Sequence, residues 1–409
     1  MKYILIIGDG MADNPVQELG GRTPLQFAKK PNMDAIASAG TVGEVLTIPE
    51  GMPAGSDTAI LSIFGCNPRV CYTGRAPLEA AATGIALESG DAVYRCNMVT
   101  LDGDGPFEEK RLVSHSAGSI EGADSDRLVT GLFETQPFKQ AAEEAGIAVY
   151  PASSFRHLAV QKSAKIDELL LIPPHDHLGE LVGGLLPSGG EGAAVLEKLM
   201  RLSFDVLEGN AVNSRRRAEG KLPANCIWFW AEGMAASLPD FSEKYGKSGG
   251  VVSAVPLCRG IGRLTGLEAR VVPGATGLLD TDYEGKVNAA LDVLKTKDFV
   301  CIHIEAPDEC THDGDLEGKI EAIERIDGRV VAPLVERLRG APQEFRMLVM
   351  SDHKTLIATR GHDGTPVPYI LFDSRHDNKT GVTYCEQSAS AGELLREGTA
   401  LMDLLFERF

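Results

Sequence analysis

Three short clusters of acidic and histidine residues lie in the C-terminal third of the chain. They contain Asp308 and His312, then Asp352 and His353, and finally His362. Each cluster follows an apolar segment, so a parallel sheet could bring all three to one edge. Carboxylate and imidazole groups are ligands for Mn, Zn or Mg, and a pair of such ions can clamp the attacking and leaving oxygens of a phosphoryl group. The pattern therefore predicts a two-metal site.

The N-terminus offers one more carboxylate. The apolar run at residues 3–8 predicts a short buried strand that ends at Asp9. Parallel strands present their carboxyl ends at a common edge of the sheet. We therefore expect Asp9 to join the three clusters.

A nucleophile is available in residues 51–65. Glycine and proline residues form a flexible approach, and residues 58–64 predict a short helix with Ser56 at its N-terminus. The unpaired backbone N–H groups and the positive dipole end of a helix favour a bound phosphate there, and a metal ion could activate the serine oxygen. Ser56 could instead only cap the helix. The ligand clusters favour the nucleophile.

A set of ordered motifs resembles one enzyme family. The motifs are Asp9-Gly10-Met-Ala-Asp13, Ser56-Asp57-Thr58, Tyr72-Thr-Gly-Arg75-Ala-Pro-Leu-Glu79, Asn213-Ser-Arg-Arg216, Pro223-Ala-Asn225, Pro273-Gly-Ala-Thr-Gly277, Glu305-Ala-Pro-Asp308 and Asp352-His353. Together they resemble the archaeal-type cofactor-independent (2,3-bisphosphoglycerate-independent) phosphoglycerate mutases, a family of the alkaline phosphatase superfamily. The resemblance runs from residue 1 to about residue 375. Similar bacterial sequences have been proposed to be homoserine kinases, so a kinase-like phosphotransferase and a metal-dependent phosphatase stay open as alternatives.

The resemblance implies two ligand sets and a reaction. Asp9, Ser56, Asp352 and His353 would hold one divalent ion, and the other ion would be held by Asp308, His312 and His362. The implied reaction converts 3-phosphoglycerate to 2-phosphoglycerate through a phosphoserine at Ser56, after which the other glycerate hydroxyl takes the phosphate back. Water must be excluded meanwhile, because otherwise the enzyme becomes a phosphatase.

A substrate-binding cap is expected within the metal-binding core. Residues 1–103 and 223–409 are predicted to form the core, and the turn-rich residues 104–222, with a long helix near 191–208, are predicted to form an inserted α/β cap domain. By resemblance, the expected substrate contacts are His115, Ser116, Arg156, Asn213 and Arg216, and Arg75 could also meet the phosphate because it follows the serine helix closely in sequence. An arginine fork binds carboxylate or phosphate bidentately. Alternatives remain: Arg75 could pair with Glu79, and the basic run at 215–217 could be a solvated helix face.

The order of apolar segments predicts the fold class. Strand-like runs alternate with helical patterns, which indicates an α/β sheet with helices on both faces. Further strands are expected at residues 42–47, 251–255, 299–305, 347–351 and 367–372, and a helix at 319–338. With the resemblance, the predicted fold is an alkaline-phosphatase-like sheet sandwiched by helices.

The composition is that of an ordinary globular protein, with 43% hydrophobic and 24% charged residues. A formal net charge of -18 argues against nucleic acid or an anionic membrane as a partner. A small anionic phosphorylated substrate would then need positive charge from metal ions and arginines. No apolar run approaches the roughly 20 residues that span a bilayer, so we expect a cytoplasmic protein. Neither charge nor motifs predict an oligomeric state.

Several other features are expected to be structural. The eight cysteines form no Cys-x-x-Cys pair and mostly lie in apolar stretches, so buried reduced thiols are expected. His175 and His177 lie in a proline-flanked loop, which favours an exposed turn over a metal site. His303 lies inside an apolar strand and is expected to have a structural role. Gly246-Lys-Ser248 lacks the earlier glycine of a phosphate-binding loop, because Phe241 occupies that position.

Overall fold

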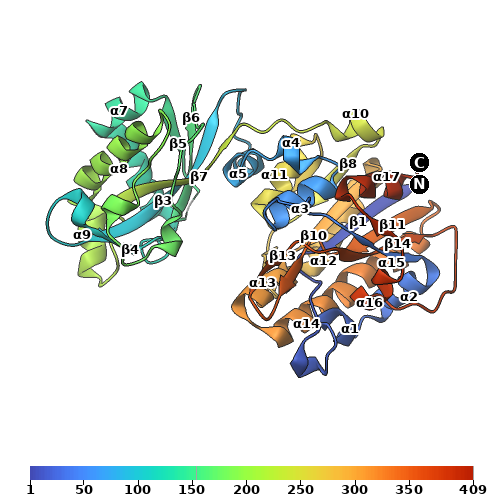
Figure 1. The fold of residues 1–409 in the computed structure, drawn as a ribbon. Coiled ribbons are helices and arrows are strands. Elements are labelled where there is room, and N and C mark those ends of the chain that lie inside the picture. The colour runs from blue at the N-terminus through green and yellow to red at the C-terminus, as the bar shows by residue number, and fades with distance from the viewer. Residues whose placement is uncertain (153, 409) are drawn as a thin grey trace. The chain divides into compact units, whose positions relative to one another are not determined.

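The chain divides into two compact units in the computed structural model, which describes residues 1–152 and 154–408 (Figure 1). The first unit contains Met1–Tyr72, Ala81–Thr83 and the chain from Ser237 onward. The second contains Thr73–Ala80 and Gly84–Ala236. All expected metal ligands belong to the first unit, and all expected substrate contacts belong to the second.

The second unit begins and ends at other residues than the expected insert of 104–222. It already includes β3 (Ala92–Asp102) and still includes β7 (Cys226–Met234). These strands pair with each other in antiparallel register, from Ala92 opposite Met234 to Val99 opposite Cys226. Because this ladder joins them in one sheet, both strands are part of the second unit rather than of the core.

The first unit is built on an eight-stranded sheet with the order β15-β2-β14-β11-β1-β10-β8-β9. In chain order its strands are β1 (Lys2–Gly8), β2 (Thr41–Val45), β8 (Gly249–Val252), β9 (Glu268–Arg270), β10 (Phe299–Ile304), β11 (Phe345–Met350), β14 (Val367–Asp373) and β15 (Leu394–Leu395). The centre is parallel, because β1 pairs in parallel with both β10 and β11. β14 is antiparallel to β11 and β2. The carboxyl ends of β1, β10 and β11 therefore meet at one edge.

Helices cover both faces of this sheet (Figure 1), which explains why its central strands are continuously apolar. On one face, Ile4 and Ile6 of β1 share a core with α2 (Pro31–Ala39), α12 (Tyr283–Thr296), α14 (Leu316–Ile326) and α15 (Ala332–Arg339). On the other face, Tyr3 stacks edge-on against Phe406 of α17 (Leu401–Phe406), with ring centroids 4.8 Å apart. α11 (Pro256–Leu264) and α3 (Ser56–Ile63) contact each other in this unit. The predicted α/β class with a helix-sandwiched sheet is confirmed.

The helix expected at 319–338 is interrupted. α14 continues into a π-helical turn (Asp327–Val331), and α15 follows directly. Pro333 has no backbone N–H to donate to the preceding turn, so the regular α-helical ladder cannot pass this position. The wide turn absorbs the mismatch and keeps the apolar side chains on the sheet.

The second unit has a five-stranded sheet of its own. Its strands are β3, β4 (Arg111–Ser114), β5 (Ile147–Tyr150), β6 (Arg156–Gln161) and β7, and its main helices are α6 (Gly122–Glu134), α7 (Phe138–Glu144), α8 (Ala193–Leu207) and α9 (Ala211–Ala218). α8 packs on β7, and its buried side chains share a core with Trp228 and Phe229. The long helix expected near 191–208 is thus present as α8.

All eight cysteines are buried and free, as expected from their apolar surroundings. Among the described helices, none combines the length and the apolar composition that a membrane crossing needs.

Candidate active site

Four expected ligands meet where β1 and β11 end. We call Asp9, Ser56, Asp352 and His353 the buried cluster, because the exposed fraction of each of its two carboxylates and its histidine is at most 1%. Nε2 of His353 lies 3.3 Å from Oδ1 of Asp9 and 3.4 Å from Oδ2 of Asp352. Oγ of Ser56 lies 3.1 Å from the same nitrogen. The four side chains thus surround one point in the interior.

Two carboxylate oxygens of the buried cluster are unsatisfied. Oδ1 of Asp9 and Oδ2 of Asp352 have no hydrogen-bond partner among the described residues. The other oxygens are held, since Oδ1 of Asp352 accepts hydrogen bonds from the backbone N–H groups of Gly10 (3.1 Å) and His353 (2.9 Å). A buried anionic oxygen without a partner is costly, and a cation between the two oxygens would satisfy both.

The remaining three expected ligands form a second group, the open cluster of Asp308, His312 and His362. Asp308 and His312 lie one turn apart on α13 (Ala306–Asp313), and His362 lies on β13 (Gly361–Asp363). Oδ2 of Asp308 is 3.2 Å from Nε2 of His312, and Oδ1 is 3.5 Å from Nε2 of His362. The side chains of His312 and His362 are 36% and 26% exposed, so water reaches this cluster.

Hydrogen bonds at Nδ1 assign the tautomers of the cluster histidines. Nδ1 of His312 lies 2.8 Å from the carbonyl oxygen of Arg360, and Nδ1 of His362 lies 3.3 Å from that of Ala54. A carbonyl oxygen only accepts, so each Nδ1 carries the hydrogen and each neutral ring presents a lone pair at Nε2. The two Nε2 atoms are nevertheless only 3.0 Å apart. At this distance the two nitrogens need a positive charge between them, either a metal ion or a proton on one of the rings.

Thr355 joins the two clusters. Its Oγ1 donates to Oδ1 of Asp308 (2.6 Å) and accepts from Nδ1 of His353 (3.1 Å). His353 therefore also presents its Nε2 lone pair to the ligand atoms around it. Gly10 makes room for this bridge, because a Cβ there would lie 2.4 Å from Oγ1 of Thr355 and its φ of +59° favours glycine.

Ser56 is the first residue of α3 rather than its cap. Gly55 occupies the N-cap position, and no side chain caps the helix. The hydroxyl of Ser56 is thus available to the buried cluster, where Oγ also lies 3.3 Å from Oδ2 of Asp9. The alternative that Ser56 serves only as a cap is wrong.

Charges within each cluster shift the titration of its members. Burial, followed by the nearby Asp352, raises the pKa of Asp9 well above its usual value. In the open cluster, a hydrogen bond to Asp308 raises the pKa of His312 to about 9 despite some burial. Burial opposes ionisation of Asp308, yet hydrogen bonds from His312 and His362 hold its pKa below the usual value. In both clusters the side chains are arranged for positive charge at their centre.

His303 was expected to be structural, but it contacts a proposed ligand. It is fully buried on β10, and its Nε2 lies 2.9 Å from Oδ2 of Asp9. Burial lowers the pKa of His303 to about 4, so the ring is neutral. The contact could not be predicted from the sequence, because His303 lies among apolar residues of a strand. The one sequence signal is that the same strand is followed by the segment that contains Asp308.

The second unit contains a cationic cavity of about 370 Å³. Its lining residues are Arg75, Arg95, Asn97, His115, Arg156, His175 and Trp230. Three of them, Arg75, His115 and Arg156, are expected substrate contacts. Sequence reasoning missed the other four, which come from β3, β7 and the loop around His175, because these segments meet only through the sheet.

The charges in this cavity favour an anion. Glu79 forms ion pairs with both Arg95 and Arg75, the second at 3.3 Å, as expected for residues four apart on a helix. Burial and the neighbouring Arg95 lower the pKa of Arg156 to about 10, and its Nε is buried without a hydrogen-bond partner among the described residues. Three guanidinium groups around one carboxylate leave an excess of positive charge.

Three other expected substrate contacts do not line this cavity. The side-chain amide of Asn213 binds the backbone of Leu207 and Ala224, and the guanidinium of Arg216 donates to the carbonyl oxygens of Leu222 and Ala117. Ser116 is buried, and its Oγ accepts from the backbone of Ser119. These polar groups are already used to hold the backbone.

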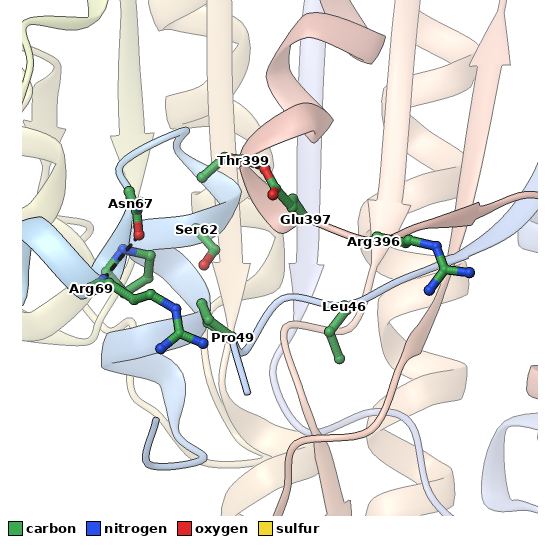
Figure 2. A pocket seen from close by; sticks show the side chains of 10 residues that line it. Leu46, Pro49, Ser62, Asn67, Arg69, Arg396, Glu397 and Thr399 are labelled. Carbon is green, nitrogen blue, oxygen red and sulfur yellow. Dashed lines mark hydrogen bonds between the residues drawn. The ribbon is translucent and has the colours of Figure 1, made fainter. Parts of the chain in front are cut away.

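Figure 2 shows a separate cavity of about 180 Å³ in the first unit. Its lining includes Ser62, Arg69 and Glu397, but no residue of either cluster. Ser62 lies near the C-terminal end of α3, whereas Ser56 begins that helix. The two serines thus lie at opposite ends of one helix, and only Ser56 reaches ligand residues.

Comparisons with known proteins identify the family of the chain. A family model described as 2,3-bisphosphoglycerate-independent phosphoglycerate mutase matches residues 37–213. A curated protein of Geobacter sulfurreducens, named as a probable 2,3-bisphosphoglycerate-independent phosphoglycerate mutase, is 44% identical and is aligned over 100% of both chains. The mutase of this name from Methanosarcina barkeri is 44% identical over 96% of both chains.

Solved structures give the same result. The PH0037 protein of Pyrococcus horikoshii superposes with a TM-score of 0.81 and 29% identity, covering 100% of this chain and 98% of its own. The cofactor-independent phosphoglycerate mutase of Thermoplasma acidophilum gives 0.66 and 26%, covering 100% and 99%. By sequence over its full length and by fold, the chain belongs to the family of 2,3-bisphosphoglycerate-independent phosphoglycerate mutases.

Proposed function

We propose that this chain interconverts 3-phosphoglycerate and 2-phosphoglycerate through a phosphoserine at Ser56. The observation that carries this proposal is the position of the Ser56 hydroxyl, which begins α3 and lies 3.1 Å from Nε2 of His353 in the buried cluster. The backbone N–H groups of the first turn of α3 would receive the phosphate oxygens.

The residues of the two clusters fit a pair of divalent ions, such as Mn, Zn or Mg. The unsatisfied oxygens of Asp9 and Asp352 and the convergent Nε2 atoms of His312 and His362 support this assignment. Asp9, Ser56, Asp352 and His353 would hold one ion, and Asp308, His312 and His362 the other. Bound ions would promote loss of the Ser56 proton and offset the charge of the transferring phosphoryl group.

The second unit would hold the glycerate while its phosphate is on Ser56. Arg156 and Arg75 would bind the carboxylate or the phosphate, and His115 would contact the glycerate hydroxyls. The excess of positive charge in the cavity supports this role, since an anionic ligand would stabilise the buried guanidinium of Arg156. Retaining glycerate is what separates a mutase from a phosphatase, because a released glycerate leaves phosphoserine to water.

The direct test is to incubate the Mn-loaded protein with 3-phosphoglycerate, without nucleotide, and to identify the quenched, metal-free products by phosphorus NMR. We expect 2-phosphoglycerate with little inorganic phosphate. A parallel incubation with ATP and homoserine separates the kinase alternative. Phosphohomoserine in that incubation, with no isomerisation in the first, would contradict the proposal, and release of phosphate alone would indicate a phosphatase.

Arg156→Ala tests the substrate-holding role of the second unit. Loss of a charged hydrogen bond should raise KM for 3-phosphoglycerate about 10- to 100-fold and increase the ratio of hydrolysis to isomerisation. Arg216→Ala is the matched control, since it removes a guanidinium that binds backbone carbonyls and should lower stability without changing the ratio. Equal ratios in the wild type and Arg156→Ala would remove Arg156 from the site.

A further inference from the structure

We infer that His303 is a positioning residue that determines which oxygen of Asp9 is offered to a metal ion. The inference rests on the proposed two-metal function and deepens it, because it assigns the orientation of a ligand to a residue outside both clusters. It is carried by hydrogen bonds on both ring nitrogens of a fully buried side chain.

The sheet register places His303 beside Asp9. β10 pairs in parallel with β1, so that His303 is opposite Ile7 and the backbone N–H of Asp9 donates to the carbonyl oxygen of Ile304 at 2.9 Å. The imidazole then reaches Asp9 with Nε2, 2.9 Å from Oδ2. On its other side, Nδ1 lies 3.1 Å from Oγ of Ser253. Both strands are central in the sheet, so this geometry is rigidly held.

The hydrogen-bond partners fix the direction of each bond. To bind an ion Asp9 must be a carboxylate, whose oxygens cannot donate, so in that state Nε2 of His303 carries the ring hydrogen and donates to Asp9. Ser253 then donates its hydroxyl hydrogen to Nδ1, while its Oγ accepts the backbone N–H of Val255 at 3.0 Å. This tautomer is the opposite of that in the cluster histidines, which carry the hydrogen on Nδ1. His303 is therefore a donor to a ligand and not a ligand itself.

The bond divides the two oxygens of Asp9 between different tasks. Oδ2 is held by His303 at 2.9 Å and more loosely by the hydroxyl of Ser56 at 3.3 Å, whereas Oδ1 has no hydrogen-bond partner among the described residues and lies 3.3 Å from Nε2 of His353. Without the N–H of His303 the carboxylate could rotate and exchange its oxygens. The free energy needed to order it would then weaken the binding of the ion. Residues that orient metal ligands in this way typically contribute 10- to 100-fold in metal affinity.

Binding of Mn²⁺ to three variants of the full chain tests the assignment. His303→Leu removes the donor but keeps an apolar side chain of similar bulk. His303→Gln can place an amide N–H near the position of Nε2, whereas the shorter side chain in His303→Asn reaches only the region of Nδ1. Affinity and stoichiometry are measured by competition with a chelating dye, and thermal unfolding in chelator reports on the fold without metal.

We expect His303→Leu and His303→Asn to bind one of two ions about 10- to 100-fold more weakly, with His303→Gln close to the wild type. Unchanged affinity in His303→Leu overturns the inference, as does an equal loss in His303→Gln and His303→Leu. If His303→Leu does not fold, Ser253→Ala is the deciding variant. Loss of the Ser253 hydroxyl leaves the ring of His303 free to change tautomer and should weaken the binding of the same ion. Unchanged affinity in that variant also overturns the inference. A wild type that binds no Mn²⁺ would instead refute the proposed two-metal function.

Discussion

The buried and open clusters combine similar carboxylate and imidazole side chains in different surroundings. Asp9, Asp352 and His353 are enclosed by the sheet and helices, and two carboxylate oxygens among them have no hydrogen-bond partner in the described chain. His312 and His362 are partly exposed, and both have raised pKa values beside Asp308. Protons can therefore replace a metal ion in the open cluster, whereas the buried cluster has two close carboxylates that water cannot solvate.

This difference indicates that the two clusters have different roles. The buried cluster contains the proposed nucleophile and is fixed by backbone N–H groups, by Thr355 and by His303. The open cluster is the one that solvent can reach. We expect the first to set the chemistry and the second to exchange its ion and its protons more readily.

The largest effect should come from the nucleophile of the buried cluster. Ser56→Ala should reduce kcat about 10⁴-fold or more while leaving the fold and the open cluster intact. Ser62→Ala is the matched control on the same helix, because Ser62 lines the separate cavity of Figure 2 and should keep wild-type activity. Turnover by Ser56→Ala within tenfold of the wild type, which is about 1.4 kcal/mol in barrier, would exclude covalent catalysis at this residue.

The next largest effect should be a reversal in the order of stability of the wild type and Asp352→Asn when metal is added, which we expect for the buried cluster only. In Asp352→Asn the amide nitrogen replaces the unsatisfied Oδ2 and can donate to Asp9, so the metal-free protein should gain about 1–3 kcal/mol in free energy of unfolding. In Mn²⁺ the wild type should become the more stable of the two, because the variant loses a charged ligand. His362→Gln, in the open cluster, should show no such gain in chelator. Denaturant unfolding with and without metal measures all three, and a destabilised metal-free Asp352→Asn would refute the strain assigned to the buried cluster.

Metal removal should occur in two phases. Chelator added to the Mn-loaded protein should take the ion of the open cluster first, because solvent reaches His312 and His362, and the buried ion more slowly. Each loss lowers the thermal midpoint, since an ion that binds only the folded state stabilises it. His362→Gln should abolish the fast phase alone. A single phase in the wild type, with both ions leaving together, would argue against the distinction.

The smallest expected effect is a pH dependence of the metal-free protein. Asp308 raises the pKa of His312 from 6.5 to about 9. Because the pKa is higher in the folded state, the contribution to stability is fully present below pH 6.5 and is lost as pH rises through about 9. His312 is partly exposed, so the contribution is modest. Chelated wild type and His312→Gln should differ in thermal midpoint at low pH and converge at high pH; a difference that grows with pH would contradict this sign.

The meeting of the proposed ligands was predictable because they follow apolar strands. Asp9 follows β1, Asp308 lies a few residues after β10, and Asp352 follows β11. The expectation that these strands are parallel was therefore enough to predict that the three carboxylates lie close together. Ser56 was found from its glycine-rich approach and from the short helix after it. Local sequence indicated these elements, whereas the choice of Ser56 as nucleophile over a helix cap depended on the ligand clusters elsewhere in the chain.

The contacts that depend on pairing between distant strands were not predictable. The cavity of the second unit needs Arg95 on β3 beside Trp230 on β7, and their register is set by an antiparallel ladder across more than a hundred residues. Asn213 and Arg216 matched a family motif, yet their polar groups hold the backbone. His303 was hidden by its apolar neighbours. A motif identifies which residue is present at a position, whereas the groups that this residue contacts are determined by the packing of the folded chain.

Acid-quenched turnover tests the central claim most directly. The Mn-loaded protein is mixed with 3-phosphoglycerate without nucleotide, quenched within one turnover, and digested for peptide mass spectrometry. We predict one phosphoryl group on the peptide that contains Ser56, formed no more slowly than 2-phosphoglycerate appears and absent in Ser56→Ala. Isomerisation without this phosphopeptide, or a phosphoryl group on another residue, would contradict the account.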